Sequence, residues 1–128
     1  MAASITLPTG WGEAQLYSPG EHRPKNGDTA RAYDHLSWQL AWAPAGRRRF
    51  ACDVEHADRS CREMAERFGM SPEKFRCCWV ATEVVAKLMN VPMLQWVKEF
   101  GLVTGEFRGA RIQLVQELNR VMAFGLLP

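Results

Sequence analysis

The sequence predicts one α+β domain that is mainly helical, with a small β-hairpin and an irregular N-terminal arm. Three observations predict this fold class. Helical spacing of apolar residues dominates from residue 58 onwards, apolar and polar residues alternate between residues 36 and 54, and glycines and prolines crowd residues 1–27. With 128 residues, 47% of them hydrophobic, the chain has enough apolar material for a core without disulfides or a bound metal. We therefore predict an arm over residues 1–27 and a single globular domain over residues 28–128.

The N-terminal arm is predicted to be irregular because glycines and prolines interrupt it at Pro8, Gly10, Gly12, Pro19, Gly20, Pro24 and Gly27. The stretches SITLP and EAQLY are each long enough for a short edge strand. Trp11 and Leu16 are expected to hold the arm against the domain, and a free tail that binds a partner is the alternative. The next segment, DTARAYDH, is predicted to form a short helix capped by Asp28 or Thr29.

Residues 36–54 alternate in the manner of two strands. Apolar side chains occupy every second position, at Leu36, Trp38, Leu40 and Trp42 and again at Phe50, Cys52 and Val54. The sequence APAG between them is typical of a turn, so the simplest prediction is a hairpin that pairs residues 36–42 with residues 47–54. A single helix over residues 28–42 is the alternative, because the apolar side chains of Tyr33, Leu36 and Leu40 also share a helical face.

Two helices joined by a tight turn are predicted after residue 58. The first has Asp58 or Ser60 as its N-cap, and Ser60 with Glu63 matches a capping box. It ends at Gly69, which takes a left-handed conformation. The second begins with Ser71 as its cap and Pro72 at its first position. It is apolar over more than half of its circumference, so we expect it to be the central and most buried element.

Two further helices are predicted towards the C-terminus. One runs from Pro92 to about Phe100, between a break at Asn90 and a stop at Gly101. The other covers about residues 108–124, because one stripe at helical spacing contains Ile112, Val115, Leu118 and Met122.

The corner at residues 61–80 resembles the helix-turn-helix family, most closely bacterial regulators with a pattern of the LAxxxGMSPxxL type. Ala65 takes the small position at which two helices cross, and Gly69 takes the left-handed turn. Ser71 and Pro72 open the second helix. A second corner, at residues 84–103, resembles the MerR-type form of the same family in its alanine, asparagine and closing FGL, with a turn that is two residues shorter.

This resemblance implies a second helix whose outward residues enter the major groove of DNA. Ser71, Lys74 and Arg76 take those positions, and the two cations would contact base edges or phosphates. The predicted hairpin tip would add three phosphate contacts, from Arg47, Arg48 and Arg49. The alternative is that the corner is only a packing device and that the arginines form a solvated turn.

No metal, cofactor or catalytic activity is predicted. Cys52, His56, Cys61 and Cys78 raise the question of a zinc site, but the spacing C-x3-H-x4-C matches no standard motif and the cysteines also fit core positions. No nucleophile motif, phosphate-binding glycine loop or paired carboxylates accompany them.

Composition leaves two candidate functions. The net charge is only +2, but 12 of the 16 basic residues are arginine and five residues are tryptophan, and these two residue types anchor binding surfaces. The first hypothesis is a small regulator that binds double-stranded DNA, as a monomer or a homodimer. The alternative is an inhibitor or adaptor that binds another protein through a Trp- and Arg-rich surface, for example a phage-encoded anti-defence or anti-CRISPR protein. The sequence shows neither a membrane span nor the pattern of a secretory signal, so we expect a cytoplasmic location.

Overall fold

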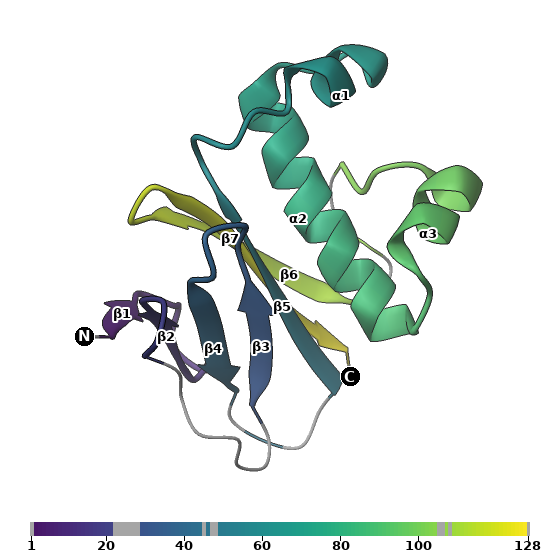
Figure 1. Cartoon of the computed structure of the whole chain (residues 1–128). Helices are drawn as coiled ribbons and strands as arrows, with labels where there is room; N and C mark the ends of the chain where they lie inside the picture. Colours follow the sequence, from purple (N-terminus) through teal and green to yellow (C-terminus); the bar gives the residue numbers. More distant parts are fainter. Residues whose placement is uncertain are drawn as a thin grey trace.

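Two antiparallel sheets and three helices make up the computed structural model, which describes residues 2–21, 29–44, 46, 49–104, 107 and 109–127 (Figure 1). The first sheet has the strand order β1 (Ala3–Ile5), β2 (Glu13–Tyr17), β4 (Gln39–Ala43), β3 (Ala30–Tyr33). The second has the order β5 (Arg49–His56), β7 (Arg120–Leu127), β6 (Arg111–Glu117). The helices are α1 (Arg62–Arg67), α2 (Pro72–Met89) and α3 (Met93–Phe100). The α+β class is therefore right, but the prediction of a mainly helical bundle is wrong.

The second sheet is the middle layer of the molecule, with the first sheet on one face and α2 on the other (Figure 1). Its central strand β7 shows why. Met122 and Phe124 face the core between the sheets, whereas Val121 and Ala123 pack against α2. A strand covered on both faces has no polar side, and this explains the continuous apolar run near the C-terminus.

The predicted C-terminal helix is wrong, because residues 111–127 form the β6–β7 hairpin. Leu118 and Asn119 both have positive φ, 53° and 58°, which is the type I′ turn that favours two-residue hairpins. The stripe at helical spacing was a coincidence of strand residues: Ile112 and Val115 lie on opposite faces of β6, Leu118 lies in the turn and Met122 lies in β7.

The N-terminal arm is also corrected, because it is built into the first sheet. SITLP overlaps the strand β1 at Ser4 and Ile5, and EAQLY is the strand β2, which pairs with β4 along its whole length. Trp11 and Leu16 are buried, as predicted. The helix predicted for residues 28–35 is the strand β3, and the single helix over residues 28–42 is excluded in the same way.

The alternating segments are both strands, but the predicted hairpin between them is wrong. Strand β4 pairs with β2 and β3, whereas β5 pairs with β7, so the chain passes from one sheet to the other between residues 43 and 49. Alternation shows which face of a strand is buried, but it does not name the neighbouring strand.

The helix–turn–helix corner has the predicted shape. Gly69 has φ of 65°, and the amide of Met70 bonds to the carbonyl of Ala65, as in a Schellman motif. Ser71 caps α2 by accepting a hydrogen bond from the amide of Lys74 at 3.2 Å. The predicted capping box is wrong, because Cys61 is the N-cap of α1 and no side chain caps this helix. Helix α2 is the long buried element that was predicted, and α3 lies close to its predicted position.

Among the described residues, no single helix is long and apolar enough to cross a membrane. Helices α2 and α3 reach the required length and composition only together, and they are bent by 106° where they meet.

Candidate functional site

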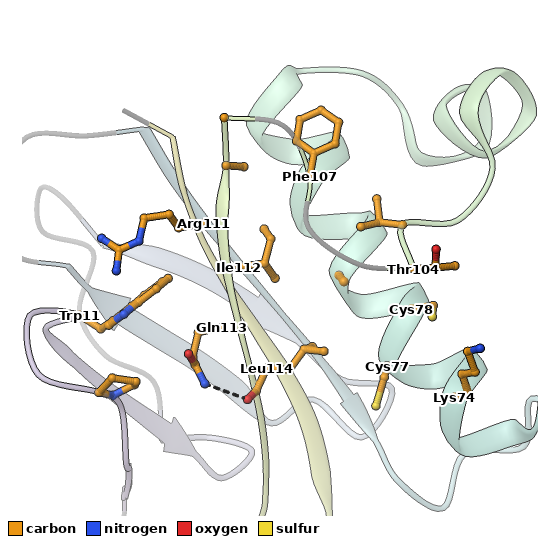
Figure 2. Close-up of a pocket in the computed structure, with 15 residues that line it drawn as sticks. Trp11, Lys74, Cys77, Cys78, Thr104, Phe107, Arg111, Ile112, Gln113 and Leu114 are labelled. Atoms are coloured by element: carbon orange, nitrogen blue, oxygen red, sulfur yellow. Dashed lines mark hydrogen bonds between the residues drawn. The ribbon is translucent and has the colours of Figure 1, made fainter.

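A groove of about 1190 Å³ runs along the strand β6. Figure 2 shows its two walls: Trp11 and Arg111 lie on one side of β6, and Lys74, Cys77 and Cys78 of α2 lie on the other. The groove therefore lies between the N-terminal part of the first sheet and the helix layer, with a strand at its base.

Strand β6 lies at the edge of its sheet, and β7 is its only partner in the described part of the chain. In a two-residue turn, the residues that flank the turn bond to each other, so the backbone groups of Glu117 point towards β7. The direction of these groups alternates along an antiparallel strand. The amides and carbonyls of Ile112, Leu114 and Gln116 must therefore point away from β7, and the first two of these residues line the groove.

A side-chain contact supports this assignment of outward-pointing backbone groups. The amide of the Gln113 side chain donates to the backbone carbonyl of Leu114 at 3.2 Å, drawn as a dashed line in Figure 2. A carbonyl that takes a partner from outside the sheet ladder is directed outwards. The edge therefore offers a row of donors and acceptors, and one acceptor is covered by a side chain from the same strand.

The first wall of the groove is held rigidly by an aromatic cluster. Trp11 stacks on Trp42 with a centroid separation of 6.0 Å, and its carbonyl accepts a hydrogen bond from the indole of Trp42 at 2.7 Å. Gly12 allows this approach, since a Cβ there would lie 2.2 Å from the carbonyl oxygen of Ala43. The guanidinium of Arg111 lies over the Trp11 ring at 5.3 Å, so a cation is positioned beside the edge of β6.

The second wall carries one exposed cation, Lys74, and two cysteines. Burial raises the pKa of Cys77 and of Cys78, so both thiols stay protonated at neutral pH. A nucleophilic cysteine needs the opposite shift, because the thiolate is the reactive form. This wall therefore suits apolar contact and one ion pair better than covalent chemistry.

The residues predicted to contact DNA do not form one cluster. Lys74 lies in the groove, and Ser71 is the helix cap. The Arg76 guanidinium donates to the carbonyl of Arg59 at 3.0 Å and lies 3.5 Å from the sulfur of Cys61, which ties it to the loop before α1. Arg49 opens β5, at the opposite edge of the sheet from β6. Arg47 and Arg48 lie outside the described residues.

The four residues considered as zinc ligands lie in different parts of the structure. Cys52 is in the core between the sheets and Cys78 faces the groove, while Cys61 precedes α1 and His56 ends β5. Within the described ranges, no three His, Cys, Asp or Glu side chains are grouped so that they could hold a metal ion.

Sequence reasoning missed the groove itself. Its base, the strand β6, falls within the segment that was predicted to be the C-terminal helix. The sequence signal for the β6–β7 hairpin was Leu118–Asn119 before an apolar run, because Asn favours the positive φ of a type I′ turn.

Comparison of the chain with protein-family models, with curated proteins and with solved structures returns no match. The function is therefore argued from the groove alone.

Proposed function

We propose that the protein is a non-enzymatic binding module that captures an extended segment of a protein along the strand β6. The observation that carries the proposal is the open edge of β6 within a groove, with backbone groups of three alternate residues directed outwards. Exposed sheet edges bind extended chains by strand addition, in which backbone hydrogen bonds provide affinity and flanking pockets provide specificity.

The two walls define what the segment looks like. Side chains of an added strand alternate between the faces of the sheet. One set meets Trp11 and Arg111, so it suits a carboxylate or an aromatic ring. The other set meets the apolar side chains of Ile112 and Leu114 and the thiols of α2, with Lys74 at the rim, so it suits apolar residues.

Proline substitution of Leu114 tests the proposal. Its amide points away from β7, so proline removes an outward donor and leaves the β6–β7 ladder in place. The matched control is Leu94→Pro, in the first turn of α3 and outside the groove, where proline is tolerated and the most exposed leucine is removed.

The experiment pans a displayed library of random heptapeptides against each chain, immobilised sparsely so that copies do not meet. We expect peptides to be enriched on the unmodified chain and on Leu94→Pro, and enrichment to be lost on Leu114→Pro. Circular dichroism verifies that each variant is folded. Equal enrichment on all three chains, or enrichment on none, would show that the edge of β6 is not a binding site.

A DNA-binding regulator is the second candidate, and the helix–turn–helix corner favours it. Ser71 and Lys74 are exposed at the start of α2, where a recognition helix would meet a base pair. The mild net charge and the tied guanidinium of Arg76 weigh against it. A gel shift on random duplex DNA decides: this candidate predicts retardation that weakens steeply with salt and is reduced in Lys74→Ala.

A further inference from the structure

We infer that the segment captured along β6 is the same strand of a second copy of this chain, so that the two sheets join into one across a two-fold axis at Leu114. This inference rests on the proposed function, because it names the occupant of the same groove. It is carried by two independent kinds of complementarity within the seven residues of β6.

The first is the direction in which the backbone amides and carbonyls point. When two copies of a strand pair antiparallel about Leu114, that residue lies opposite itself and Ile112 lies opposite Gln116 of the partner. These are the positions whose amides and carbonyls point outwards. Hydrogen-bonded pairs in an antiparallel ladder need outward groups on both residues, and this axis supplies them at every such pair. An axis between two residues would instead place outward groups opposite inward ones. An axis at Gln113 would keep outward groups paired, but it would place Arg111 opposite Val115 instead of Glu117, so the charges described next select Leu114.

The second is charge. The same axis places Arg111 of one copy opposite Glu117 of the other, and the pair occurs twice. Both side chains are on the face of β6 that meets the first sheet: Arg111 lies over Trp11, and the Glu117 carboxylate accepts a hydrogen bond from the amide of Thr6 at 3.4 Å. Opposite charges at facing positions stabilise a strand pair, and like charges destabilise it.

The groove fits this occupant. It flanks residues 109–114, which include the first half of β6, and the two-fold axis brings residues 114–117 of the partner against this half. On the partner's strand, Leu114 and Gln116 would face α2, while Val115 and Glu117 would face Trp11 and Arg111. On each copy, the side-chain amide of Gln113 would leave the carbonyl of Leu114, which then accepts the partner's amide.

Charge reversal isolates the contact between copies. Residues 111 and 117 are about 20 Å apart along an extended strand, so they do not interact within one chain. Arg111→Glu should place Glu opposite Glu, and Glu117→Arg should place Arg opposite Arg. We expect each single variant to weaken the dimer about tenfold, and the double variant Arg111→Glu/Glu117→Arg to recover the original affinity.

Mixing the two single variants provides a second test, because a heterodimer of Arg111→Glu with Glu117→Arg has two opposite-charge pairs. The mixture should associate at concentrations at which each variant alone is monomeric. The same geometry predicts that Leu114→Pro abolishes association, since it removes both hydrogen bonds at the axis.

Sedimentation equilibrium of the full chain measures these effects against a chain mass of 14.5 kDa. The synthetic peptide RIQLVQE, which copies residues 111–117, should dissociate the dimer, and a scrambled peptide should not. A chain that stays monomeric while the peptide library still binds it in a Leu114-dependent way overturns this inference and leaves the proposed function standing. A dimer whose affinity is unchanged by Leu114→Pro and by the charge reversals also overturns it. An unmodified chain that neither dimerises nor enriches library peptides refutes the two proposals together.

Discussion

The two edges of the second sheet differ in what lies beside them. Strand β5 has β3 of the first sheet alongside it, and all four residues from Ala51 to Val54 are buried. Strand β6 faces the groove, and Arg111, Leu114 and Gln116 are exposed. Strand β3 thus lies beside β5, whereas β6 meets the N-terminal segment through the contacts of Arg111 with Trp11 and of Glu117 with Thr6.

Small side chains explain the closed edge. Ala32 of β3 packs with Cys52 and Val54 of β5 in the core between the sheets. The open edge instead carries long polar side chains, which is one way in which proteins keep an edge strand from pairing at random. One edge of the sheet is therefore buried by the first sheet, whereas the other has exposed residues along its length.

The largest expected effect is on the closed side, where a buried ion pair joins the sheets. The Arg120 guanidinium, at the base of the β6–β7 turn, lies 3.1 Å from the carboxylate of Asp34, and both side chains are buried. Asp34→Ala leaves the arginine buried without its counter-ion. We expect a loss of about 3–5 kcal/mol in the free energy of unfolding, measured by urea denaturation.

The exposed pair between Arg59 and Glu55 is the control for this prediction, because the arginine side chain is 55% exposed. Glu55→Ala should cost less than about 1 kcal/mol. Equal losses in the two variants would show that burial of the Arg120–Asp34 pair has no special effect.

The next effect concerns the support of the open edge. Gly125 of β7 leaves space for α2, and a Cβ there would lie 2.4 Å from Val84 Cγ1 and 2.9 Å from Leu88 Cδ1. Gly125→Ala should therefore overpack this layer and cost about 1–3 kcal/mol, measured by urea denaturation. A variant as stable as the unmodified chain would mean that these side chains move aside freely.

A pH effect is expected at the closed edge. Burial, followed by the nearby Glu83 carboxylate, raises the pKa of Asp53 from 3.8 to about 8, although Lys87 lies 3.4 Å away. The folded state then keeps a proton that the unfolded state releases. Stability from this group is complete below the unfolded pKa and is lost as the pH rises through about 8.

Asp53→Asn removes this titration. We compare the free energy of unfolding of the variant with that of the unmodified chain at low pH and again above pH 8. The difference should shift in favour of the variant by at least about 1.4 kcal/mol, since each pKa unit is worth about that much. Glu73→Gln, which changes an exposed carboxyl to the same kind of amide, is the matched control substitution. If the pH profile of Asp53→Asn ran parallel to that of the unmodified chain, the buried Asp53 carboxyl would not keep its proton in the folded state.

Local signals predicted the elements better than their arrangement. Gly69, Ser71 and Asn90 marked helix ends because caps depend on the conformation of a few residues. The partners of β4 and β5 were beyond such reasoning, because strand pairing joins residues distant in sequence. The groove was missed for the same reason: Trp11, Cys77 and Arg111 come together only after β6 is recognised as a strand.

Strand addition at β6 requires that backbone groups point alternately towards β7 and away from it, and hydrogen exchange of single amides by NMR measures this alternation. In dilute protein, the amides of Ile112, Leu114 and Gln116 should exchange rapidly while those of Gln113 and Val115 exchange slowly. On concentration, the first three should become protected as a second copy pairs with them. Rapid exchange at Gln113 and Val115, or no change at Leu114 on concentration or on addition of a peptide selected from the library, would contradict the account.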